Sequence, residues 1–235
     1  NVQATYNFSK SLSLQLRTSM DLAYEERAQK RPYDAGSKLQ KGSLRTQDIF
    51  SNEFSADFLL KYARKFGRFD ISAMGGGSLL RNRYIKNETR ADSLIYPGVY
   101  SFANSAGPLL SMPYNSKYAI NSFYGIFTAS YNKIFFVDIT GRQDWNSVLA
   151  TPNRTTNAGF FYPSVNTSVV LSNLLRMPRK ITYDKLRFSA SSVDSGGTSP
   201  YLTAYNYESA GSFFAGGLQA PGLLANPNLR PLRTT

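Results

Sequence analysis

Cysteine and histidine are both absent from the 235-residue chain. Without cysteine there is no disulfide framework and no thiolate metal site, and without histidine the commonest general base and metal ligand are missing. Charged residues make up only 18% of the sequence, below the roughly 25% of an ordinary soluble domain. No catalytic, cofactor-binding or metal-binding cluster is visible, so we expect the chain not to be an enzyme and to need no cofactor.

Long hydrophobic runs are also missing. No stretch of eighteen apolar residues and no signal-peptide pattern occurs, so no helix is expected to span a membrane. The mean hydropathy is -0.33, although aromatic residues reach 14%. Flat aromatic side chains suit the pleated surface of a sheet. A polar average with many aromatics and few charges is typical of a wall with one lipid face and one wet face.

The net charge of +12 has no single location. Basic residues are scattered through polar stretches, whereas a nucleic-acid site needs them gathered on one element with interleaved aromatics. We therefore expect no nucleic-acid partner and interpret the charge as basic surface loops. In a bacterial outer membrane such residues could meet the phosphates of lipopolysaccharide.

Apolar and polar residues alternate with a period of two over much of the chain. Alternation of this length predicts half-buried strands rather than amphipathic helices. About ten residues is also the length that a tilted strand needs to cross a bilayer. Eight strands are predicted, beginning at Val2, Leu12, Phe54, Phe69, Phe123, Phe135, Val165 and Leu186.

Short and long connections between these strands alternate along the chain. In an outer-membrane barrel, short periplasmic turns and long external loops lie at opposite ends. We therefore predict one rim for the turns at 9–11, 64–67 and 132–133 and for the intermediate connection at 172–182. The opposite rim should hold the long loops at 24–46, 81–118 and 146–159.

The alternation also assigns faces. We expect lipid to be contacted by Leu14, Phe58, Phe127, Val137, Val169 and Phe188. We expect the lumen to be lined by Asp57, Asp138, Arg142, Asp144 and Arg187. The acidic and basic residues between 138 and 144 could touch a plug or a solute, but a cross-strand charge ladder that supports the wall is the favoured interpretation. Asp138 and Asp144 would lie about 20 Å apart at roughly 3.3 Å per residue, too far for glycosidase chemistry.

Aromatic residues fall at strand ends and in the longest loop. Membrane-interface anchors are predicted at Tyr62, Tyr131 and Trp145. Trp145 could instead stack on a sugar ring, although anchoring is favoured. Four loop aromatics could bind a ligand or a partner, or equally pack the loop on itself; they are Tyr96, Tyr100, Phe102 and Tyr114. The glycines at 75–77 lack the helix that a phosphate-binding loop requires, so they indicate a strand kink or a close backbone approach.

Several motifs follow one another in a fixed order in the second half of the chain. They are Gly-Arg-Gln-Asp-Trp-Asn-Ser at 141–147, Phe-Tyr-Pro-Ser-Val at 161–165, Lys-Leu-Arg-Phe-Ser-Ala-Ser at 185–191 and Asn-Pro-Asn-Leu-Arg-Pro at 226–231. In content and order they resemble the later barrel of SusC/RagA-family TonB-dependent transporters of Bacteroidetes. The resemblance covers residues 120–235; before that it rests on alternation and loop length alone. Leu232 stands where the family usually has Glu.

The resemblance implies an all-β fold, with about eight strands of a larger antiparallel transmembrane β-barrel of about 22 strands. Residues 1–235 would form part of one TonB-dependent transporter barrel domain, with the plug domain and the terminal strands outside this stretch. We also expect a longer protein because the chain opens inside an alternating segment at Asn1.

The same resemblance implies a function and partners. The protein would lie in the outer membrane of a Gram-negative, Bacteroidetes-like cell, surrounded by lipid and lipopolysaccharide. It would import an oligosaccharide or a peptide with a SusD-like surface lipoprotein, powered by TonB through parts absent here. The alternative is a non-transport barrel, either a surface adhesin or a small self-contained barrel of eight strands. In a self-contained barrel, the first and last strands would pair with each other.

Overall fold

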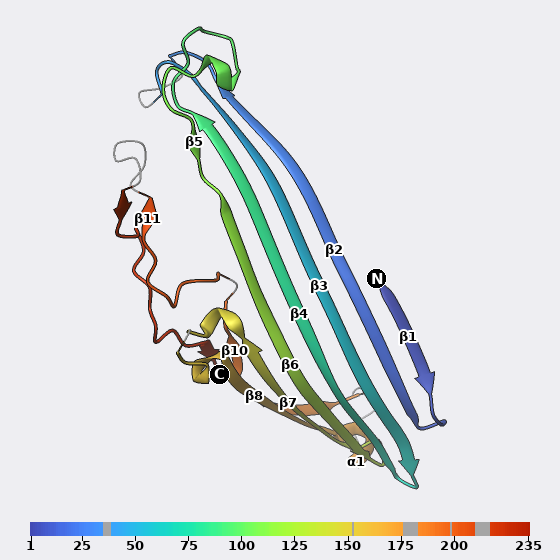
Figure 1. Ribbon diagram of the computed structural model, residues 1–235. Helices are drawn as coiled ribbons and strands as arrows, with labels where there is room; N and C mark the ends of the chain where they lie inside the picture. Colours follow the sequence, from blue (N-terminus) through green and yellow to red (C-terminus); the bar gives the residue numbers. More distant parts are fainter. Residues whose placement is uncertain (35–38, 152, 176–182, 198, 210–216) are drawn as a thin grey trace.

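A computed structural model describes residues 1–34, 39–151, 153–175, 183–197, 199–209 and 217–235. One long, curved antiparallel sheet dominates this part of the chain (Figure 1). Helical structure in the described residues is limited to the single turn α1 (Leu171–Leu174) and three short 3-10 turns, η1 (Phe102–Asn104), η2 (Ser147–Leu149) and η3 (Thr156–Ala158). None of these helices combines the length and the apolar character needed to cross a membrane.

The main sheet follows the order of the chain, so each strand pairs with its sequence neighbour. Its path consists of β1 (Val2–Asn7), β2 (Leu12–Arg31), β3 (Ser43–Phe66), β4 (Phe69–Ala91), β6 (Tyr114–Tyr131), β7 (Phe135–Asn146), β8 (Gly159–Val170) and β9 (Lys185–Ser191). The short β5 (Leu110–Ser111) adds to the end of β4. The eight strands predicted from alternation are therefore confirmed.

Two small two-stranded sheets lie outside the main sheet in the described residues. β10 (Val193–Ser195) pairs with β13 (Leu232–Thr234), and β11 (Glu208–Ser209) pairs with β12 (Leu218–Gln219). At the edges of the main sheet, β1 pairs with β2 and β9 pairs with β8; in the part of the chain that the structure describes, β1 and β9 do not pair with each other. The sheet is open, and this contradicts the alternative of a self-contained eight-stranded barrel.

Four strands, β2, β3, β4 and β6, are much longer than the sequence predicts. The expected loop at 24–46 shrinks to 32–42, because β2 and β3 stay in register from Ala23 opposite Ser51 to Arg31 opposite Ser43. The expected loop at 81–118 shrinks to 92–113 in the same way. Beyond Leu22 both faces of β2 carry polar residues, so the period-two signal disappears although the backbone ladder continues. A strand with water on both faces needs no apolar residue on either.

The connections fall at the two ends as predicted. The β1–β2, β3–β4 and β6–β7 turns and the α1 turn lie at one end of the sheet, and residues 32–34, 39–42 and 92–113 lie at the other (Figure 1). The connection at 147–158 points the same way as the long loops but lies lower. The preceding strand, β7, ends at Asn146, which lies opposite Ile120 of β6. Ile120 in turn pairs with Leu80 of β4, and β4 continues well past this point to Ala91. Residues 176–182 of the predicted connection at 172–182 lie outside the described residues.

The glycine run at 75–77 does not end a strand, because β4 continues through it to Ala91. A Cβ atom at Gly76 would lie 2.6 Å from the carbonyl oxygen of Phe58 and 2.8 Å from Cζ of Tyr124. A Cβ atom at Gly77 would lie 2.7 Å from the Phe58 ring. The close backbone approach expected from the sequence is confirmed for Gly76, whereas Gly77 is approached by side-chain rings and Gly75 faces open space.

Candidate functional site

The two faces of the main sheet differ in chemistry and in exposure. Strand register places all six predicted lipid-contacting residues on one face, which we call the apolar face, and all five predicted lumenal residues on the other, the polar face. On the apolar face, Phe123 is 56% exposed and Ile139 is 47% exposed. On the polar face, Ser122 is 2% exposed and Asp144 is 8% exposed. The usual arrangement of a soluble protein is inverted, and so large an exposed apolar surface indicates a partner or a membrane.

The apolar face has a sharp upper limit. Its belt covers residues 12–22 of β2, 54–62 of β3, 69–79 of β4, 123–131 of β6, 135–145 of β7 and 161–169 of β8. Each segment is close to the 9–11 residues that a tilted strand needs to cross hydrocarbon. Directly above the belt the same face carries the polar residues Asn52, Arg81, Arg83 and Lys117, and beyond them the apolar row of Tyr24, Phe50 and Ile85.

The three predicted anchors lie on the apolar face. At the turn end of the belt, the Tyr131 ring lies 4.8 Å from that of Phe69, measured between centroids. Trp145 ends the belt on β7 and meets the edge of Phe123 at 6.1 Å. Tyr62 lies on β3, near the turn end, opposite Leu12. These positions suit aromatic residues at a membrane–water interface, and the anchoring role remains a prediction.

On the polar face, Arg142 and Asp144 form a network across three strands. Nε of Arg142 donates to Asp144 at 2.7 Å, and its Nη2 donates to the Ser122 hydroxyl at 3.0 Å. The Tyr162 hydroxyl donates to the other Asp144 oxygen at 2.5 Å, and the Arg142 guanidinium lies 5.7 Å from the Tyr124 ring. Because β6, β7 and β8 are tied together in this way, the network supports the interpretation of a structural ladder.

The other predicted lumenal residues do not join this network in the described residues. Asp57 accepts from Nε of Arg17 across the β2–β3 pair at 2.9 Å. Asp138 faces Thr128 and Asn166 in the register, and Arg187 faces Ser168. The polar face is therefore a series of separate contacts along the strands. No group of three or more metal-ligating acidic side chains occurs within the described ranges.

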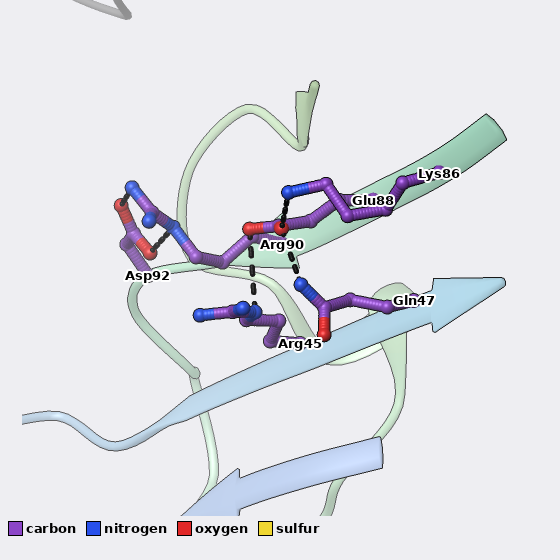
Figure 2. A network of polar contacts seen from close by, with 6 residues as sticks. All are labelled: Arg45, Gln47, Lys86, Glu88, Arg90 and Asp92. Atoms are coloured by element: carbon purple, nitrogen blue, oxygen red, sulfur yellow. Dashed lines mark hydrogen bonds and ion pairs between the residues drawn. The ribbon is translucent and has the colours of Figure 1, made fainter. Parts of the chain in front are cut away.

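A second polar network lies near the loop end of β3 and β4, on the polar face (Figure 2). Glu88 is its centre and is only 5% exposed. Its carboxylate accepts from Nε2 of Gln47 at 2.6 Å and from Nζ of Lys86 at 3.2 Å, and Nε of Arg45 lies 3.3 Å away. Beside it, Nη2 of Arg90 donates to Asp92 at 3.0 Å.

This Glu88 network was missed by sequence reasoning because residues 24–46 and 81–118 were expected to be loop. Its members alternate along the chain at Arg45 and Gln47, and at Lys86, Glu88 and Arg90. That alternation is visible in the sequence, but it involves polar residues only. The pairing of β3 with β4 is what brings the two sets together.

The pKa of Glu88 follows from these contacts. Burial by itself raises the pKa of the carboxyl group, but the hydrogen bonds from Gln47 and Lys86 and the nearby Arg45 lower it by more, so the pKa lies below its ordinary value. A lowered pKa in the folded state means that ionised Glu88 stabilises the fold above its ordinary pKa of about 4.3. That stabilisation is lost as the pH falls through the lower folded-state pKa.

We therefore expect acid to loosen the loop ends of β3 and β4. Hydrogen exchange of the full-length protein, corrected for the intrinsic effect of pH, should show protection at 43–50 and 84–91 falling as Glu88 is protonated. The variant Glu88→Gln should be less protected at neutral pH and should lack this acid-dependent step. Equal pH profiles for the two proteins would contradict the assignment.

The loop at 92–113 is partly packed on itself. Tyr100 and Phe102 pack with Tyr33 against the small buried cluster of Leu44, Ala91 and Leu94. The Tyr33 hydroxyl donates to the carbonyl oxygen of Leu94 at 2.6 Å. For Tyr100 and Phe102, the packing alternative is therefore the one that the contacts favour.

Tyr96 and Tyr114 are different. Both are exposed, and Tyr114 lies on the polar face with its ring 6.0 Å from that of Tyr84. These two aromatics stay available as candidates for contact with a ligand or a partner.

The comparisons with known proteins rest on structure. No protein-family model matches the sequence, and no curated protein matches it. A solved structure of the RagAB peptide transporter matches with a TM-score of 0.80 and 16% identity, covering 98% of this chain and 26% of that chain. Structures of the RagAB peptide importer in the closed-closed and open-open states match with TM-scores of 0.76, 17% identity and the same coverage. The chain thus spans about a quarter of the length of the chains it matches, and its fold is that of part of a larger antiparallel β-barrel, as in those transporters.

Proposed function

We propose that this chain is part of the barrel wall of a SusC/RagA-type TonB-dependent transporter in the outer membrane of a Gram-negative, Bacteroidetes-like cell. The whole protein would import a bulky nutrient, an oligosaccharide or a peptide. Residues 1–235 would belong to one barrel domain, with the plug domain and the terminal strands elsewhere in the protein. The barrel would have about 22 strands, a size whose lumen is filled by a plug.

The observation that carries the proposal is the inverted exposure of the sheet. Large apolar side chains such as Phe58, Phe123 and Phe161 are exposed, while on the opposite face Ser122, Ser130 and Asp144 are buried and most other polar residues are half-buried. Hydrocarbon cannot hydrogen-bond a peptide group, so a sheet that crosses a bilayer must close on itself. An open sheet of eight strands with a belt of bilayer height is what part of a closed barrel would look like.

The polar face is then the lining of the lumen. Asp57, Asp138, Arg142, Asp144 and Arg187 would line a water-filled or plug-filled interior, and the Glu88 network would hold the outer end of the wall in shape. A wall stiffened by cross-strand contacts suits a transporter in which a plug moves while the barrel stays fixed.

The long loops fit a partner at the outer surface. We propose that a SusD-like lipoprotein covers the loops at 32–42 and 92–113, with the exposed Tyr96 among its contacts. The neighbours in structure are peptide transporters, and this favours a peptide over an oligosaccharide as the solute. TonB would act through the plug.

An adhesin or a barrel enzyme explains the observations less well. An adhesin needs the loops but not a lumen lined by ordered charge networks. An enzyme needs a positioned nucleophile and base, whereas the hydroxyl–carboxylate pair of Tyr162 and Asp144 is held with Arg142 in the cross-strand network of the wall. The chains that share the fold belong to transporters.

Uptake by cells tests this proposal. We expect a strain that lacks the gene of the full-length protein to stop removing a tryptic peptide digest from the medium, as measured by mass spectrometry. A strain without TonB should show the same loss, since the energy comes from the inner membrane. A parallel culture with mixed maltodextrins tests the oligosaccharide alternative. Unchanged removal of both mixtures by the deletion strain would overturn the transporter proposal.

A further inference from the structure

Three basic residues gather where the apolar belt ends on the loop side. Arg81 and Arg83 lie on β4 and Lys117 lies on β6, all exposed and all on the apolar face. Arg83 and Lys117 are direct partners in the register, and Arg81 lies two residues along, opposite Ala119. The three cations therefore occupy neighbouring positions on adjacent strands.

This arrangement is unfavourable without a counter-charge. Like charges directly opposite each other on a sheet destabilise it, and none of the three cations forms an ion pair with an acidic side chain of the described residues. Arg81 donates only to the carbonyl oxygen of Leu80 and to the Asn121 side chain, each at 3.0 Å.

The nearest carboxylates on the same face do not neutralise the cluster. Glu26 and Asp48 pair with each other, and Asp48 lies four residues farther from the belt along β3 than Asn52, the partner of Arg83. The apolar row of Tyr24, Phe50 and Ile85 separates them from Arg83. The cluster is thus an isolated patch of positive charge on the outside of the wall.

The surface around these cations is hollowed. A depression of about 450 Å³ is lined by Arg81, Arg83, Lys117, Asn52 and Phe54, among others. Directly below it, within the belt, lies an almost wholly apolar groove of about 500 Å³. The small side chain of Ala56 lies in this groove, and the larger Leu16, Leu79, Phe58 and Phe123 line it.

We propose that this surface binds a phosphorylated, acylated glycolipid of the lipid A type from the outer leaflet. Its phosphate would accept hydrogen bonds from Arg81, Arg83 and Lys117, and one acyl chain would lie in the groove below. Arginine suits this task because its planar group offers paired donors to phosphate oxygens. The inference rests on the proposed function in one respect, namely that the apolar face meets lipid and the loop end faces outward.

The combination of the two hollows selects the ligand. A free phosphate would use the cations but leave the groove empty, and an uncharged lipid would use the groove but leave the cations unpaired. A phosphorylated lipid satisfies both at once, with its charged part at the border of the belt. The shared wall of the two hollows, formed by β3, β4 and β6, sets the distance between them.

Native mass spectrometry of the full-length transporter in detergent tests the proposal. Lipid A, the same lipid with its phosphates removed, and inorganic phosphate are added in separate titrations. We expect lipid A to bind and the triple variant Arg81→Gln, Arg83→Gln, Lys117→Gln to bind it about a hundredfold more weakly, because each basic residue near an anionic lipid contributes about a fivefold effect. The variant Ala56→Phe should fill the groove and weaken lipid A binding while keeping the belt apolar.

Matched controls separate this site from general charge attraction. The variant Arg64→Gln, Lys65→Gln, Arg68→Gln removes the same number of charges from the opposite rim and should bind lipid A as the parent does. Heat-modifiability on gels identifies any variant that does not fold, and for such a variant the single replacements are titrated instead. Equal lipid A binding by the cluster variant and the parent would overturn the site. Equal binding of the phosphate-free lipid, or tight binding of inorganic phosphate alone, would do the same.

The result is independent of the test of transport. Loss of lipid A binding in the cluster variant with peptide removal intact supports the lipid site as a feature of the outer wall. Unchanged peptide removal by the deletion strain would overturn the transport proposal but would leave the titrations unchanged, since they need no import. The two proposals therefore fail on different measurements.

Discussion

An arginine in place of Ile139 is expected to destabilise the barrel by about 2–4 kcal/mol, the cost of a basic residue at the bilayer midplane on the lipid face of a barrel strand. Ile139 is 47% exposed on the apolar face and lies in the same row as Phe127 and Val165, halfway along the belt. The free energy of unfolding of the full-length protein in lipid vesicles, from guanidinium titration, measures the effect.

Two neighbouring positions serve as controls, one at a different depth in the belt and one on the opposite face of the sheet. Val137 is on the same face but only two residues from Phe135 at the turn, so Val137→Arg should cost less, nearer the 0–1 kcal/mol or so of an interface position. Asp138→Arg places the same side chain on the polar face beside it and should stay close to the parent. An equal cost at Ile139 and at Asp138 would contradict the face assignment.

A methyl group added at Gly76 is expected to destabilise the barrel by about 1–3 kcal/mol, the usual range for overpacking. Its Cβ atom would lie 2.6 Å from the carbonyl oxygen of Phe58, and this oxygen belongs to the ladder between β3 and β4. Tyr124 could turn its ring away, but the carbonyl group cannot move without breaking backbone hydrogen bonds. Unfolding of Gly76→Ala by guanidinium, followed by heat-modifiability, checks this value.

The neighbouring glycine is the matched control. Gly75 lies on the apolar face with nothing within 4 Å of an added Cβ atom. Gly75→Ala should therefore leave the stability within about 0.5 kcal/mol of the parent, as for a surface replacement away from any special feature. If both alanine variants were equally stable, the close approach at Gly76 would make no difference to the free energy of unfolding.

The sequence by itself determined the fold class and the faces. Eight strands were predicted from a period of two, and all eight are present, because a strand with one apolar and one polar face must alternate with that period. Residues such as Phe58 and Asp57 were assigned to opposite faces for the same reason. The motifs from Gly141 to Pro231 indicated the transporter family, and the fold of solved peptide transporters agrees with that indication.

The tertiary structure decided how far the strands continue beyond the apolar belt and which residues lie opposite one another on neighbouring strands. The extension of β2, β3 and β4 toward the loops carries no hydrophobic period, since water contacts both faces there, so the sequence predicted loops instead. The Glu88 network, the clash that an alanine would meet at Gly76 and the row of Arg83 beside Lys117 all depend on strand register. Register joins residues that are far apart in the chain through backbone hydrogen bonds, which every residue type except proline can make, and the side chains alone therefore do not reveal it.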